Sequence, residues 1–171
     1  DLSDPRSIDA LIAALPAGTD GLLNVAGLPP TSGAVSVVRV NLLGLKRLTL
    51  GYVDKLADGA AIVNVASLAA LGWQDAIPAI KAVDKITNFE DTETFCNKHN
   101  IDDARSYFFT KEALVVWTMQ NRWTWRNRGI RMNCVSPGPV ETPILKDFLE
   151  TLGERAAEDM KVMDRAGTPE D

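Results

Sequence analysis

Three short apolar runs, separated by longer stretches with helical spacing, constrain the fold of this chain more than any other feature. The runs are residues 20–26 (DGLLNVA), 60–65 (AAIVNV) and 130–135 (IRMNCV). A continuous apolar run of this length is typical of a parallel strand that is buried on both faces. Because strands alternate with helices, right-handed crossovers are expected, and the sequence predicts an α/β fold with a doubly wound parallel sheet.

Helix boundaries are marked by capping and breaking residues. Asp4 is the expected N-cap of a first helix, with Pro5 in its first turn and an end near Pro16. The remaining expected helices cover residues 35–56, 105–125 and 144–163, and the polar segment 76–104 is interpreted as an inserted helical segment. The prediction is one domain over residues 1–171.

Composition excludes several classes of protein. The 171 residues hold 18 Lys and Arg against 23 Asp and Glu, which gives a net charge of −5. This balance argues against nucleic acid or an anionic membrane as partner. Two cysteines form no disulfide scaffold, and no apolar run approaches the roughly 20 residues of a membrane span. We therefore expect a cytoplasmic protein that binds neither membrane nor nucleic acid.

Two other kinds of site find little support. Cys96 and His99 lie close together, but further soft ligands are lacking, so no metal site is predicted. Trp and Arg residues are mixed within 117–131, as in some surfaces that bind single-stranded nucleic acid, yet an amphipathic helix running into a strand explains them.

Tyr107 and Lys111 form the sharpest chemical pattern. Side chains at i and i+4 share one face of a helix. A tyrosine, with a pKa of about 10, is a poor acid or base at neutral pH, and a nearby ammonium group favours the phenolate. The pair therefore suggests proton transfer, although a surface tyrosine packed on a lysine stem gives the same spacing.

Small and polar residues follow each expected strand, where open parallel sheets bind their ligands. They are Asn24 to Gly27, Ser67, and Pro137 with Gly138. Each set on its own is also compatible with ordinary turn chemistry.

The order of these features is more specific than any one of them. Asn-x-Ala-Gly at 24–27, Asn41, Ser67, Tyr-x-x-x-Lys at 107–111 and Pro-Gly-x-x-x-Thr-Pro at 137–143 follow one another along the chain. This arrangement resembles the classical short-chain dehydrogenase/reductase family over the whole sequence. The resemblance implies a Rossmann fold and an enzyme that moves hydride between a nicotinamide cofactor and an alcohol or ketone.

Carried over by motif, the resemblance implies four catalytic residues. Tyr107 would exchange the proton of the alcohol, Lys111 would lower its pKa and bind the nicotinamide ribose, and Ser67 would orient the substrate oxygen. Asn41 looks like the helix asparagine that holds a water in the proton relay.

The resemblance also implies a cofactor site for NAD, with NADP as the alternative. Asp1 and Leu2 resemble the pair that meets the adenine ring. Asn24, Ala26 and Gly27 resemble the segment beside the adenosine, where Val25 replaces a commoner asparagine. The other cofactor-binding residues implied are Tyr107, Lys111, Pro137, Gly138, Val140 and Thr142.

Two departures from the family pattern stand out. Ser67 and Tyr107 are 40 positions apart, whereas about a dozen is common, which makes the segment near 76–104 an insertion. A similar insertion occurs in the bacterial 3α-hydroxysteroid dehydrogenase/carbonyl reductase branch. In addition, no Gly-x-x-x-Gly-x-Gly turn is present in the sequence. We expect it to precede Asp1, together with the N-terminal strands, and a last strand to follow Asp171, so the sequence as given should bind nucleotide poorly.

The sequence thus predicts an NAD(P)-dependent oxidoreductase that interconverts a secondary alcohol and a ketone, with a hydroxysteroid and its 3-ketosteroid as the favoured pair. A carbonyl reductase or epimerase acting on another small ketone is an alternative in the same fold. A non-catalytic nucleotide-binding member of the family is an alternative from a different class. By resemblance, the protein is expected to form a homodimer or homotetramer.

Overall fold

The computed structural model describes residues 1–153, 158, 160–161 and 164–171. Its sheet has three parallel strands in the order β1-β2-β3. The strands are β1 (Thr19–Asn24), β2 (Leu56–Val65) and β3 (Arg131–Val135). Asn24, Asn64 and Cys134 are in register, so the carboxyl ends of the three strands meet at one edge. The predicted parallel α/β fold is confirmed.

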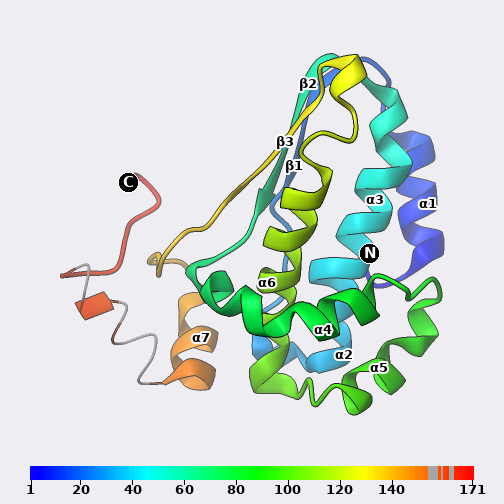
Figure 1. The fold of residues 1–171 in the computed structure, drawn as a ribbon. Helices are drawn as coiled ribbons and strands as arrows, with labels where there is room; N and C mark the ends of the chain where they lie inside the picture. The colour runs from blue at the N-terminus through cyan, green and yellow to red at the C-terminus, as the bar shows by residue number, and fades with distance from the viewer. Residues whose placement is uncertain (154–157, 159, 162–163) are drawn as a thin grey trace.

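Helices connect the strands (Figure 1). The longer ones are α1 (Pro5–Ala14), α2 (Ala34–Val38), α3 (Leu45–Tyr52), α4 (Trp73–Val83), α5 (Thr92–Lys98), α6 (Asp103–Asn121) and α7 (Leu145–Leu152). Short 3-10 turns lie at η1 (Pro30–Ser32), η3 (Val53–Lys55), η4 (Leu68–Gly72), η5 (Phe89–Asp91) and η6 (Arg126–Arg128).

The first helix begins as the sequence predicts. The carboxylate of Asp4 accepts a hydrogen bond from the backbone N–H of Arg6, which satisfies one of the free donors of the first turn. Residues 34–52 form one continuous helical stretch, also as expected. Its middle is a π-helical segment, η2 (Arg39–Gly44), which contains Asn41 and connects α2 to α3. Such segments are frequent at functional sites.

The expectation that the strands are buried on both faces is wrong for the described residues. Ile62, Asn64 and Met132 are buried on the face toward the helices, whereas Leu23 and Val135 on the other face are 69% and 49% exposed. Figure 1 shows α1, α3 and α6 on the same side of the strands. An apolar run indicates that a strand lies in a sheet. It does not indicate which face of the strand the described helices cover.

Two clusters of buried side chains lie between the sheet and these helices. One is centred on Ile62, Leu114 and Trp117, where α6 crosses the strands. The other joins α2, α4, α5 and α6, and includes Ile80 and Phe109. α4 and α5 make the segment 76–104 largely helical, and the second cluster shows that this segment packs on the body of the protein.

Three other boundaries differ from the sequence prediction. β2 begins at Leu56, before the Asp58-Gly59 pair, and α6 ends at Asn121 instead of Trp125. α7 ends at Leu152, ahead of Gly153 with φ of 48°, and part of the helix expected to reach Met163 lies outside the described residues. Within the described part of the chain, no helix has the length and apolar character needed to cross a membrane.

Candidate active site

Ser67 follows β2 at the carboxyl edge of the sheet and is fixed by its neighbours. The backbone N–H groups of Ala66 and Leu68 donate to the carbonyls of Val135 and Pro137, at 2.8 and 3.1 Å. The Ser67 hydroxyl accepts from the N–H of Ala69 at 3.1 Å, which caps η4. Since a hydroxyl has one donor and two acceptor positions, its O–H remains available to donate.

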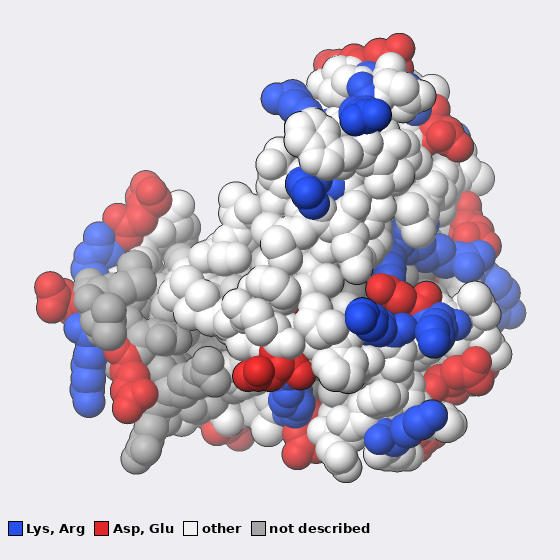
Figure 2. All heavy atoms as spheres, in the orientation of Figure 1, with Lys and Arg blue, Asp and Glu red and all other residues white. Residues whose placement is uncertain are grey.

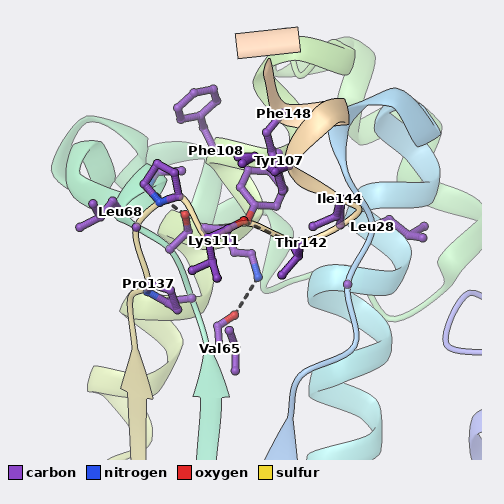
Figure 3. A pocket seen from close by; sticks show the side chains of 18 of the residues that line it. Leu28, Val65, Leu68, Tyr107, Phe108, Lys111, Pro137, Thr142, Ile144 and Phe148 are labelled. Carbon is purple, nitrogen blue, oxygen red and sulfur yellow. Dashed lines mark hydrogen bonds between the residues drawn. The ribbon is translucent and has the colours of Figure 1, made fainter. Parts of the chain in front are cut away.

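Tyr107 and Lys111 project from α6 toward this edge. Asp102 is the N-cap of this helix, and its carboxylate accepts from the N–H of Arg105 at 2.8 Å. One turn apart, the two side chains meet: the Lys111 Nζ atom lies 5.4 Å from the centroid of the Tyr107 ring. Nζ also donates to the carbonyl oxygen of Val65 at 2.7 Å, shown as a dashed line in Figure 3. The pattern at 107–111 is therefore not a surface pair, because Lys111 is buried.

Burial dominates the titration of both groups. It raises the pKa of Tyr107, while a side-chain hydrogen bond with Ser67 acts in the lowering direction. Desolvation lowers the pKa of Lys111 to about 8. The expectation that Lys111 lowers the pKa of Tyr107 differs from this result, since burial outweighs the favourable influences on the phenolate. The influence of Ser67 on the pKa of Tyr107 reflects how near the two hydroxyl groups are in the cavity that both line, where both can reach one substrate oxygen.

Around these groups lies an apolar cavity of about 370 Å³. Lys111 is the only charged group among the described residues that line it. Of the predicted site residues, the cavity collects Gly27, Ser67, Tyr107, Lys111, Pro137, Gly138, Val140 and Thr142. Figure 3 shows Thr142, Ile144 and Phe148 on one side of Tyr107, and Leu68 and Pro137 on the other. In Figure 2, the described surface seen in this view is also largely uncharged between the upper tip and the C-terminal segment.

A second hollow collects the other predicted cofactor residues. It is lined by Asp1, Leu2, Ser3, Ala26, Gly27, Leu28, Ser36 and Val40. Gly27 and Leu28 line both hollows, so the two are neighbours on either side of the loop after β1. Two adjoining hollows of this kind suit an elongated ligand that places one end in each.

Asn41 lies behind that loop and lines neither hollow. Its Oδ1 accepts from the N–H of Leu28 at 2.7 Å, and its Nδ2 donates to the Leu28 carbonyl at 2.9 Å. The amide is buried. In this structure Asn41 therefore fixes the backbone that separates the hollows, and the water-holding role implied by resemblance stays a prediction.

Asn24 also points away from both hollows. Its Nδ2 donates to Thr49 Oγ1 and Asn64 Oδ1, at 2.9 and 2.8 Å, and Asn64 Nδ2 donates to Thr118 Oγ1 at 2.9 Å. This buried network links β1 and β2 to α3 and α6. A fully partnered polar network fixes the packing of its elements, so the Asn24 side chain holds the sheet edge in place.

Several lining residues had no sequence signal. They are Leu28, Val65, Phe108, Ile144, Leu145 and Phe148. Apolar residues near a site look like core residues, and the role of Val65 belongs to its backbone carbonyl. Only the position of Phe108, directly after Tyr107, could have marked it.

The comparisons with known proteins agree with this geometry. Residues 91–171 match the family described as enoyl-(acyl carrier protein) reductase. Coniferyl-alcohol dehydrogenase of Pseudomonas sp. strain HR199 is 38% identical over 155 residues, which are 90% of this chain and 61% of that protein. The 3-alpha-hydroxysteroid dehydrogenase/carbonyl reductase of Comamonas testosteroni is 27% identical, over 96% of this chain and 66% of the relative. In sequence and in fold, the chain is therefore similar to the short-chain dehydrogenase/reductase family.

The fold is also similar to that of a solved hydroxysteroid dehydrogenase. The 3-alpha-hydroxysteroid dehydrogenase from Pseudomonas sp. B-0831, complexed with NADH, superposes with a TM-score of 0.80 at 26% identity. The match covers 99% of this chain and 70% of that protein. This chain thus spans about two thirds of the length of these three dehydrogenases.

Proposed function

We propose that the protein is an NAD(P)-dependent oxidoreductase that interconverts an apolar alcohol and its carbonyl compound. The observation that carries this proposal is the convergence of Ser67, Tyr107 and Lys111 at the carboxyl edge of a parallel sheet, inside an apolar cavity. Each group has a distinct chemical task, and no other cluster in the described part of the chain combines a donor, a proton carrier and a cation in this way.

In the oxidative direction two bonds to hydrogen break and a C=O bond forms. Ser67 and Tyr107 bind the substrate oxygen, and the proton of its O–H passes to the Tyr107 oxygen. A bound nicotinamide cofactor supplies the acceptor for the hydride that leaves the carbinol carbon. In reduction Tyr107 returns its proton to the carbonyl oxygen. The Lys111 ammonium beside the ring stabilises the phenolate between these steps.

The described residues fit such a cofactor. The Thr142 hydroxyl and the Lys111 ammonium in the first cavity suit a carboxamide and a ribose, while Asp1 in the second hollow offers a carboxylate to an adenine amine. Gly27 and Gly138 carry no side chain where a ring would approach the backbone. NAD is the favoured cofactor, and the complex of the hydroxysteroid dehydrogenase with NADH supports it.

Two substrate classes have support. A hydroxysteroid and its 3-ketosteroid are favoured by the similarity to hydroxysteroid dehydrogenases in sequence and in structure. A primary aromatic alcohol is favoured by the higher identity to coniferyl-alcohol dehydrogenase. Both are apolar apart from oxygen groups, in keeping with a cavity whose described lining has one charged group.

The test uses the full-length protein, titrated with NADH and NADPH and then assayed with a 3α-hydroxysteroid, a coniferyl-type alcohol and a small aryl ketone. Tyr107→Phe should abolish turnover of every substrate while the affinity for the cofactor changes little. Turnover that survives this substitution would contradict the proposal. Binding of cofactor without turnover of any alcohol or ketone would favour a non-catalytic nucleotide-binding protein instead.

The domain and assembly predictions belong to the same proposal. We place residues 1–171 in one catalytic domain, with 76–104 as its insertion, in a cytoplasmic homodimer or homotetramer. Light scattering of the full-length protein measures its oligomeric state directly.

A further inference from the structure

Phe148 of α7 makes a direct ring contact with Tyr107, the proposed proton carrier. Its ring packs edge-on against the ring of Tyr107, with centroids 4.6 Å apart and an interplanar angle of 61°. Both rings line the same cavity. In a substrate whose oxygen is bound by Ser67 and Tyr107, the carbinol carbon is bonded directly to that oxygen and so lies beside both residues. A substituent that leaves this carbon on the α7 side therefore meets Phe148.

The position of Phe148 is set by contacts of α7 with the loop after β1. The Asp147 carboxylate lies 3.4 Å from the Thr31 hydroxyl of η1, and α7 and η1 are in contact. On the opposite side of the cavity, Leu68 follows Ser67 and Phe108 follows Tyr107 (Figure 3). The cavity beside Ser67 and Tyr107 thus has apolar side chains on both sides.

From this geometry we propose that Phe148 is a specificity-determining residue, which favours alcohols and carbonyls that carry a flat aromatic ring next to the reacting carbon. The inference rests on the proposed function and names the substrate class for the same site. Aromatic rings attract one another in edge-to-face and offset arrangements with centroids about 4.5–7 Å apart, beyond what their buried area contributes. A puckered alicyclic ring of the same size presents no such face.

The decisive experiment replaces the ring of Phe148 and keeps its apolar character. Phe148→Leu in the full-length protein is assayed with 1-phenylethanol and 1-cyclohexylethanol, which differ only in the aromaticity of the ring. Because each substrate is compared with itself in the two proteins, differences in intrinsic reactivity cancel. We expect kcat/KM for the phenyl substrate to fall about 2- to 10-fold, the size of an aromatic pair contribution, and kcat/KM for the cyclohexyl substrate to stay the same or rise.

Leu149→Ala is the matched control, because Leu149 is the next residue of α7, is 39% exposed and does not line the cavity. It should leave the ratio of the two kcat/KM values unchanged. An equal fall for both substrates in Phe148→Leu, or no fall for either, overturns the inference while the proposed function stands. Wild-type protein that oxidises neither of these alcohols but turns over the hydroxysteroid or the coniferyl-type alcohol also overturns the inference and leaves the proposed function standing. Wild-type protein that turns over none of these substrates overturns both.

Discussion

The Nζ atom of Lys111 donates a 2.7 Å hydrogen bond to the carbonyl oxygen of Val65, the last residue of β2. This bond gives the buried ammonium a partner without a compensating charge. It also fixes the lysine beside the Tyr107 ring, in the position that the proposed chemistry needs.

The first prediction concerns the stability cost of this buried cation. Its pKa is lowered from 10.5 to about 8 by desolvation. Between these values the unfolded chain binds more protons than the folded one, so the stability of the wild type should rise with pH across the window. Relative to Lys111→Met, the free energy of unfolding of the wild type should increase by about 3 kcal/mol at most across this window.

Denaturant unfolding of both proteins at about pH 7 and about pH 9.5 measures this difference. The raised pKa of Tyr107 has the opposite effect on stability. Its contribution to the stability of the fold is present at lower pH and is lost only as the pH rises above about 10. The two effects are therefore separate. A wild-type advantage over Lys111→Met that stays constant with pH would contradict the burial of a charged lysine.

The second prediction concerns Asn41 and the loop it holds. Asn41→Ala removes both partners of the Leu28 backbone, leaving a part-buried N–H and carbonyl unsatisfied. We expect a loss of about 1–3 kcal/mol in the free energy of unfolding. The affinity for NADH should weaken as well, since Leu28 lines both hollows. Asn41→Asp keeps the acceptor for the N–H but turns a carboxylate oxygen toward the carbonyl, so it should be destabilised too. Wild-type stability in both variants would show that the two hydrogen bonds between Asn41 and the Leu28 backbone do not stabilise the fold.

How far the sequence predicted this site depends on the kind of contact. Periodicity placed Tyr107 and Lys111 on one helix face, and the position of Ser67 after an apolar run placed it at the sheet edge, because both depend on local geometry. The partners of Asn41 and Asn24 could not be predicted. A polar residue in a helix or strand does not reveal which backbone or side chain it meets after packing. The approach of Phe148 to Tyr107 joins segments 41 positions apart and depends on how α7 packs against η1.

The same distinction explains the differences in the fold. Gly129, with φ of 67°, terminates the turn before β3 as its residue type predicts. In contrast, the apolar runs predicted burial on two faces, and the described helices cover one. The π-helical segment around Asn41 carries no local sequence signal either.

The third prediction tests a close approach between a helix and the chain before α1. A Cβ atom added at Gly44 would overlap the backbone oxygen of Leu2, and backbone atoms cannot give way as a flexible side chain does. Gly44→Ala should therefore lower the free energy of unfolding by about 1–3 kcal/mol and displace Leu2 from the second hollow. Gly21→Ala is the control, since a Cβ there makes only ordinary contacts of 3.5 Å or more. Equal unfolding midpoints for the two variants would refute the close approach.

The fourth prediction concerns the segment that supports Thr142. The N–H of Gly167 donates to the Pro139 carbonyl, and the N–H of Glu141 donates to the Gly167 carbonyl, both at 2.8 Å. The turn that presents Gly167 is closed by Asp171, whose carboxylate accepts from the Arg165 guanidinium at 2.6 and 2.9 Å and from the Thr168 N–H at 2.7 Å.

Asp171→Asn removes the charge that closes this turn, so the amides of Gly167 and Glu141 should lose protection against hydrogen exchange. The loss should be selective, because the amides of β2 belong to the sheet and not to this turn. Glu170→Gln is the matched control, since it neutralises the neighbouring exposed carboxylate. Hydrogen-exchange mass spectrometry of the three full-length proteins measures the effect. Unchanged exchange at residues 139–142 in Asp171→Asn would show that the Arg165–Asp171 pair does not support the loop beside the cavity.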